Sequence, residues 1–259
     1  MRSMMKTAQQ AQNSRVYDVA ITVGLIAYGV VYLLVAWIAL QLAWGNSSEE
    51  ASQSGALQEL ADKPLGGFLL WVVALGLFAL VIWKVLDLVY GNLDTKKKLS
   101  AGGRAVVYLA LGISAIRVAM GSGGSSAGKQ ESMTARLMES GAGRALVVLI
   151  GLVIIAVGVR QLYKSWKVKF TEDLTGGVSH STILLGRVGY AAKGIAFVIV
   201  GVLFAWAALD YDPQKAGGLD TALRTIKDQP FGAVLLTLMA VGIACFGVYC
   251  FVWSRNAKH

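Results

Sequence analysis

The sequence has little of what metal sites, disulfides and active sites require. Its 259 residues include only two cysteines and two histidines. Cys245 and Cys250 are spaced too far apart for a disulfide within one helix, and neither histidine falls in an apolar stretch where it could hold zinc or haem. No nucleophile elbow, phosphate-binding loop, dinucleotide-binding fingerprint or Cys-x-x-Cys motif occurs. We therefore expect a protein that is not an enzyme and that has no cofactor or metal.

Charge is equally scarce. Charged residues make up 15% of the chain, whereas 56% is hydrophobic and the mean hydropathy is +0.59. No carboxylate lies deep in an apolar stretch, and this argues against the proton relay of a proton-coupled transporter. A soluble domain does not need so much apolar surface. The composition therefore predicts an integral membrane protein.

The apolar residues fall into stretches of membrane-spanning length. About 20 apolar residues cross a bilayer core. Six stretches qualify, at approximately residues 17–44, 65–90, 101–120, 144–163, 184–209 and 231–253. The sequence thus predicts an all-α fold with six transmembrane helices.

The distribution of positive charge predicts the orientation. If the N-terminus is cytoplasmic, that side holds about twice as many Lys and Arg residues as the other. This bias places both termini in the cytoplasm. The net charge of +9 then indicates contact with anionic membrane lipids, and we expect no nucleic-acid partner.

One two-helix unit is written three times. The sequence YGVVY at 28–32 returns as RAVVY at 104–108 and as KGIAF at 193–197. A second phrase, PLG at 64–66, returns as PFG at 230–232, while the middle copy keeps only glycines there, at Gly141 and Gly143. Repeats with an even number of spans share one orientation, which predicts pseudo-threefold symmetry about the membrane normal. The predicted organisation is a cytoplasmic tail at 1–16 and three repeats at 17–93, 94–170 and 171–259, the last ending in a short cytoplasmic tail.

The three extracytoplasmic loops each carry a short amphipathic segment. Leu219, Ala222, Leu223 and Ile226 recur at helical spacing in the third loop. Such a segment is typical of an interfacial helix that lies on the bilayer or caps the bundle. The alternative is a lid over a cavity that faces outward.

Two repeated motifs resemble a known family. They are GYAAKGIAF at 189–197 and the P-[FL]-G-x-x-L-L pattern that begins at Pro64 and again at Pro230. Together they resemble the bacterial family of domain of unknown function 1206, over about residues 17–254. This resemblance implies a six-span bacterial inner-membrane protein made of three two-helix repeats, and it implies no activity. Copy two departs from the pattern, because it lacks the proline and the Gly-Tyr pair.

The repeat also defines a set of candidate site residues. Tyr28, Arg104 and Lys193 occupy equivalent positions, expected near the cytoplasmic ends of the first, third and fifth spans. If all three face the axis, they form a polar ring suited to a lipid phosphate or another anion. Alternatively, Arg104 and Lys193 extend from the lipid-facing side to the headgroups. Arg117, near the outer end of the third span, is a secondary candidate.

Two functions fit these observations. The first is a non-enzymatic scaffold, accessory or lipid-binding protein, which acts through membrane lipids, a second copy of itself or another membrane protein. The alternative is a pore or carrier for a small anionic solute along the pseudo-threefold axis. The pair Lys84 and Asp87, three residues apart, is expected to form an ion pair without a further role.

Overall fold

The computed structural model describes residues 15–45, 49–90, 95–174 and 178–256. Helices dominate this part of the chain, and it contains no β-strand. The predicted N-terminal tail, residues 1–16, lies outside the described residues except for its last two. The last three residues of the predicted C-terminal tail also lie outside them.

Six long helices are each long and apolar enough to cross a membrane. This confirms the six predicted spans, which differ from the observed helices by only a few residues. The long helices are α2 (Arg15–Trp44), α4 (Gly66–Tyr90), α5 (Thr95–Ala119), α7 (Gly141–Trp166), α8 (His180–Asp210) and α10 (Gly232–Arg255). The short helices are α3 (Gln53–Ala61), α6 (Ser126–Met138), η1 (Lys169–Asp173), η2 (Pro213–Ala216) and α9 (Gly218–Lys227).

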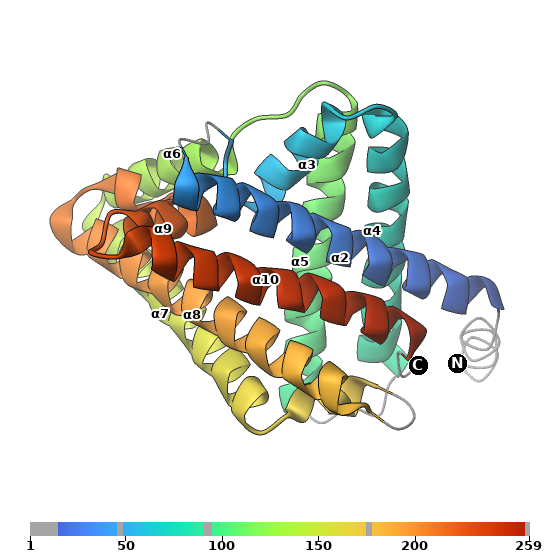
Figure 1. Ribbon diagram of the computed structural model, residues 1–259. Coiled ribbons are helices and arrows are strands. Elements are labelled where there is room, and N and C mark those ends of the chain that lie inside the picture. The colour runs from blue at the N-terminus through green and yellow to red at the C-terminus, as the bar shows by residue number, and fades with distance from the viewer. Residues whose placement is uncertain (1–14, 46–48, 91–94, 175–177, 257–259) are drawn as a thin grey trace.

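The long helices associate mainly between repeats. The second helix of each repeat makes its most extensive contact with the first helix of the next, in the pairs α4 with α5, α7 with α8, and α10 with α2. Figure 1 shows these as three two-helix layers, with the blue and red helices of the last pair side by side. The last repeat thereby packs against the first, so the three repeats close on one another.

The middle repeat departs from this regularity. Within the first and third repeats the two long helices also pack together, as α2 with α4 and α8 with α10. Within the described residues, α5 and α7 make no contact of that extent. Only 17% of the most apolar part of α7 is buried inside the molecule, against 56% for α2. Pseudo-threefold symmetry therefore stays a prediction.

Glycine explains how closely the paired helices approach. A Cβ on Gly151 of α7 would lie 2.7 Å from the carbonyl oxygen of Gly201 on α8, and one on Gly158 would lie 2.8 Å from that of Gly194. Neither gap admits a side chain, so small residues permit the contact, as in other membrane helix pairs.

The repeated Pro-x-Gly phrase forms a specific turn before α4 and α10. Leu65 and Phe231 take left-handed backbone angles, with φ of 65° and 61°. The next residue, Gly66 or Gly232, begins the helix, and a Cβ there would lie 2.3 Å or 1.9 Å from a carbonyl oxygen of the preceding turn. The prolines lie in the turn itself, two residues before each helix. The motif therefore encodes a tight connection between a short outer helix and a long one.

Candidate functional site

Lys193 is a buried cation near the middle of a long apolar helix. It lies about halfway along α8, and only 7% of its surface is exposed. Tyr28 has a similar place on α2 and is 5% exposed. The sequence analysis placed both near the ends of their spans, and this was wrong, because both helices extend about four turns on either side of these residues. The burial of Lys193 also rules out its reaching the headgroups from the lipid-facing side.

Three aromatic rings surround the Lys193 ammonium group. Its nitrogen lies 3.7 Å from the ring centre of Phe246, 4.5 Å from that of Tyr32 and 5.5 Å from that of Tyr28. It donates a hydrogen bond to the Tyr28 hydroxyl over 3.4 Å. Among the described residues, no carboxylate lies within ion-pair distance of it. Ring faces attract a cation, but they do not neutralise its charge.

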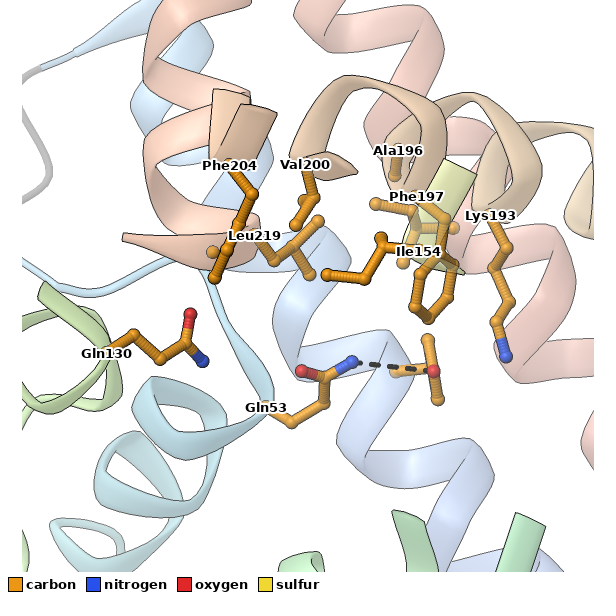
Figure 2. A pocket seen from close by; sticks show the side chains of 12 residues that line it. Gln53, Gln130, Ile154, Lys193, Ala196, Phe197, Val200, Phe204 and Leu219 are labelled. Carbon is orange, nitrogen blue, oxygen red and sulfur yellow. Dashed lines mark hydrogen bonds between the residues drawn. The ribbon is translucent and has the colours of Figure 1, made fainter. Parts of the chain in front are cut away.

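The same lysine borders a cavity of about 250 Å³. In Figure 2 Lys193 lies at one side of this cavity and Gln130 of α6 at the other. Residues of seven helices line the cavity, namely α2, α3, α6, α7, α8, α9 and α10. Most of that wall is apolar, comprising Ile154, Ala196, Phe197, Val200, Phe204, Leu219 and Ile243. An apolar cavity with a few polar groups is the usual form of a small-molecule site.

A chain of hydrogen bonds runs along one side of the cavity. Lys193 donates to the Tyr28 hydroxyl, which donates to the Tyr32 hydroxyl over 3.2 Å. The side-chain amide of Gln53 also donates to Tyr32, over 3.4 Å, as the dashed line in Figure 2 marks. Tyr32 therefore accepts two hydrogen bonds. Among the described residues, none accepts the proton of its own hydroxyl.

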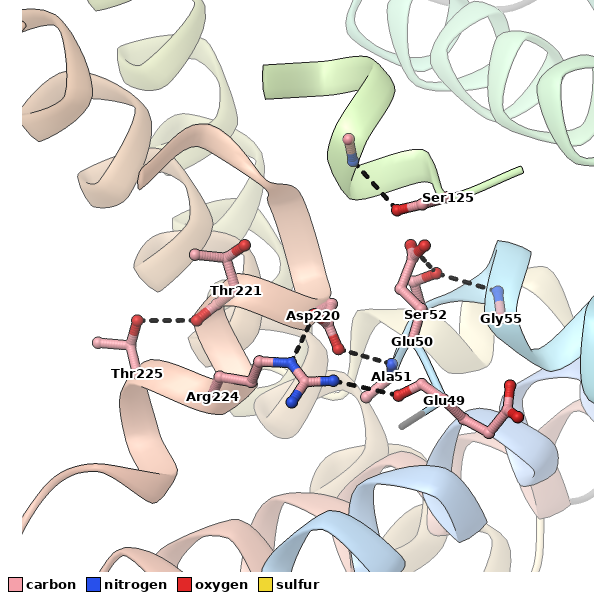
Figure 3. Close-up of polar contacts among 11 residues, drawn as sticks. Glu49, Glu50, Ala51, Ser52, Gly55, Ser125, Asp220, Thr221, Arg224 and Thr225 are labelled. Carbon is pink, nitrogen blue, oxygen red and sulfur yellow. Dashed lines mark hydrogen bonds and ion pairs between the residues drawn. The ribbon is translucent and has the colours of Figure 1, made fainter. Parts of the chain in front are cut away.

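The short helices α3, α6 and α9 lie at one end of this cavity, where Gln53, Gln130 and Leu219 line it. The backbone just before α3 is joined to α9 through Asp220, which is 7% exposed. Its carboxylate accepts from the Ala51 backbone N–H and from the Arg224 guanidinium, each over 2.8 Å (Figure 3). This position fits both a cap on the bundle and a lid over a cavity, so the two interpretations of the amphipathic segments stay open.

Arg104 takes part in a separate cluster. Its guanidinium forms a 2.8 Å ion pair with Asp173 of η1, and Lys164 of α7 lies 3.5 Å from the same carboxylate. Burial opposes ionisation of Asp173, but the two cations, Arg104 first, outweigh it and lower the pKa of this carboxyl to about 2. Arg104 thus has an anionic partner, whereas the part of the chain that the structure describes offers none to Lys193.

A layer of aromatic rings separates the two cations. The Tyr28 ring contacts that of Tyr108, one helical turn beyond Arg104, with centres 5.2 Å apart. Tyr190, Phe246 and Tyr249 pack edge to face or at a tilt beside them. The predicted ring of three residues is therefore divided. Tyr28 and Lys193 are joined by a hydrogen bond, and Arg104 belongs to the other cluster.

The structure also shows where the remaining candidate residues from the sequence lie. Arg117 is exposed in the last turn of α5 and lines no part of the cavity. Lys84 and Asp87 form the expected ion pair, with 2.8 Å between nitrogen and oxygen, so that prediction is confirmed.

Sequence reasoning missed Tyr32, Gln53, Phe246 and Asp173. Tyr32 carried a signal, because it lies four residues after Tyr28 and so shares its helical face. The other three come from separate elements, α3, α10 and η1. No pattern along the chain connects them to Lys193 or Arg104.

Comparison with known proteins gives two matches. The family model described as Domain of Unknown Function (DUF1206) matches residues 23–91, 99–168 and 188–257, one segment within each predicted repeat. The chain is also 29% identical over 238 residues to the uncharacterized protein YxxB of Bacillus subtilis (strain 168), across 87% of this chain and 86% of that protein. No solved structure matches the chain significantly.

Proposed function

The chain belongs to the DUF1206 family, and we propose that it is a non-enzymatic bacterial membrane protein that binds an anionic amphiphile in the cavity beside Lys193. The observation that carries this proposal is a buried ammonium group at the wall of an apolar cavity, for which the described residues supply no carboxylate partner. A buried charge is costly unless it is paired. An anionic ligand would supply the missing charge.

The shape of the cavity supports an amphiphile over a simple anion. Lys193 stands at one side, and the apolar wall continues along α8 as far as Phe204. Eleven residues of helix separate the two, which is about 16 Å at 1.5 Å per residue. A small inorganic ion would leave most of this apolar wall without a partner. A ligand with an anionic group and an apolar tail would contact both parts.

The charge bias of the sequence supplies the orientation in this proposal. With both termini in the cytoplasm of the bacterium, the inner membrane holds the protein so that α3, α6 and α9 face the extracytoplasmic side. The ligand then occupies the outer half of the bilayer. Membrane lipids, or amphiphiles dissolved among them, are the expected partners, and a role as an accessory protein to other membrane components fits a cavity without catalytic groups.

Lys193→Met tests this function. Protein purified in a mild nonionic detergent should retain an anionic amphiphile at about one molecule per chain, as measured by mass spectrometry of an organic extract. Methionine keeps the length and apolar stem of lysine but removes the charge, so we expect retention to fall about tenfold or more, the equivalent of about 1.4 kcal/mol or more of binding free energy.

Lys63→Met is the matched control, because this lysine lies at the outer end of the molecule, has a 54% exposed side chain and does not line the cavity. Its retention should equal that of the wild type. Equal retention by wild type and Lys193→Met, or no anionic amphiphile in the wild type, would contradict the proposal.

A carrier for a small anionic solute is the second candidate. Its support is the cationic cluster of Arg104 and Lys164 on the far side of the aromatic layer from Lys193. Movement of an anion between these clusters would require Tyr28, Tyr108 and Phe246 to separate. If the purified protein retains a ligand at Lys193, that result favours the binding function over the carrier function.

A further inference from the structure

We propose that the ligand is an amphipathic monocarboxylate whose carboxylate group lies between the ammonium of Lys193 and the hydroxyl of Tyr32. This inference rests on the proposed function and adds the chemical class of the ligand. Both residues line the cavity, from α8 and α2, and both are more than nine-tenths buried. Tyr32 also lies against Lys193, since the ammonium is 4.5 Å from its ring centre.

The hydrogen-bond directions leave two donors for the ligand. Lysine can only donate, so the Tyr28 hydroxyl accepts from Lys193, and it donates its own proton to Tyr32. Gln53 donates to the same Tyr32 oxygen. The Tyr32 proton and two of the three Lys193 protons consequently remain. A buried donor without an acceptor is rare in folded proteins, and a ligand oxygen at each would satisfy both.

Charge selects a carboxylate over a phosphate monoester. The cavity wall carries one cation, Lys193, and no other charged side chain. A carboxylate brings one negative charge and two acceptor oxygens, which matches one ammonium and one hydroxyl. A phosphate monoester brings about −1.5 to −2 charges and three oxygens. Its excess charge would be buried without a partner.

Size selects a short apolar tail. A cavity of about 250 Å³ is slightly smaller than the roughly 300–1,000 Å³ of sites that hold a drug-sized molecule. The enclosed part of the ligand is therefore small, such as one short chain. A medium-chain fatty acid fits this limit, whereas a phospholipid with two long chains exceeds it.

The test is a titration of the full-length protein with octanoate, octyl phosphate and octan-1-ol, which share one tail. Binding is measured by calorimetry in nonionic detergent at neutral pH. We expect octanoate to bind about tenfold or more tightly than octyl phosphate, and octan-1-ol to bind weakly. Tyr32→Phe should weaken octanoate about tenfold by removing one donor, and Lys193→Met should abolish its binding.

Tyr108→Phe is the matched control. This tyrosine is also buried and lies in the aromatic layer, but it does not line the cavity. Its octanoate affinity should equal that of the wild type. Melting curves of the three variants without ligand check that each is folded.

Each remaining outcome has a definite meaning. Stronger Lys193-dependent binding of octyl phosphate would overturn the carboxylate assignment and leave the proposed function standing. Octanoate binding that Tyr32→Phe does not change would overturn the two-donor site alone. If none of the anionic amphiphiles binds in a Lys193-dependent way, both the inference and the proposed function fail.

Discussion

Two cations at equivalent repeat positions, the half-buried Arg104 and the buried Lys193, have different chemical surroundings. Arg104 is neutralised by Asp173, which lies 69 residues later in sequence and in a different element. Lys193 has aromatic neighbours and a cavity in place of a carboxylate. A paired cation contributes to stability, whereas an unpaired one is costly unless a ligand completes it. This difference favours a structural role for Arg104, and it is the basis of the binding role that we propose for Lys193.

Asp173→Asn tests the structural role. The pKa of Asp173 in the folded protein, about 2, is below its ordinary value of 3.8, so its ionised form stabilises the fold at neutral pH. That contribution is present above about pH 4 and is lost as the pH falls toward 2. The substitution should lower the free energy of unfolding at pH 7 by about 2 kcal/mol. Thermal unfolding in nonionic detergent measures it.

The pH series separates this effect from general damage. The difference between wild type and Asp173→Asn should shrink as the pH falls below 4, because the wild-type carboxyl becomes protonated. Glu172→Gln, a change at the exposed neighbouring residue, should match the wild type throughout. A difference that is constant from pH 7 to pH 3 would contradict the role given to the Arg104–Asp173 ion pair.

At the level of the helices, glycine decides which elements meet. Gly151 and Gly158 of α7 face Gly201 and Gly194 of α8 at distances that exclude a Cβ. By contrast, a Cβ on Gly103 of α5 would meet nothing within 4 Å. Glycine content alone therefore does not reveal an interface, since some of the 30 glycines pack and others do not.

Gly151→Ala and Gly103→Ala form a matched pair of variants. An added methyl group at Gly151 would meet backbone atoms of α8 at 2.7 Å and 2.9 Å, so the helices must separate, at a cost of about 1–3 kcal/mol. At Gly103 the same change should be neutral or stabilising by up to about 1 kcal/mol, because alanine favours helix over glycine. Thermal unfolding of both variants checks this. Equal effects would contradict the close packing of α7 with α8.

At the scale of the whole molecule, three helix pairs join three repeats in a closed order. Each pair combines one helix from each of two successive repeats, and α10 returns to α2. The middle repeat is the irregular one, since its helices α5 and α7 do not pack on each other as the others do. The cavity lies where outer helices of all three repeats meet α8. Its wall is thus a product of the whole chain.

The orientation of the molecule can be tested with two single cysteines in a background where Cys245 and Cys250 are alanine. Ser122 is exposed after α5, and Glu172 is exposed in η1 at the opposite end. A membrane-impermeant maleimide should label Ser122→Cys in intact cells and label Glu172→Cys only after permeabilisation. The reverse pattern would contradict cytoplasmic termini and place the cavity in the inner half of the bilayer.

The success of the sequence predictions followed from the range of the interactions involved. The six spans depend on local hydropathy, and the Lys84–Asp87 pair depends on three residues of one helix, so both were predictable. Lys193 could be chosen as a candidate because a cation in an apolar stretch is visible in the sequence. The prediction that Lys193 forms a ring with Arg104 was less well founded, because equivalent positions in a repeat do not determine which side chains each residue contacts.

The sequence by itself determined the helical membrane architecture, the three repeats and the turns at Pro64 and Pro230, because hydropathy, periodicity and the Pro-x-Gly turn act over a few residues. Only the tertiary structure decided which cation lacks an anion. Tyr28 and Lys193 are 165 residues apart. Gln53 belongs to the first repeat, and Phe246 lies on α10, the second long helix of the repeat that contains Lys193. Such distant side chains meet only when all the helices have packed, and that packing buries the Lys193 charge and forms the cavity of the proposed site.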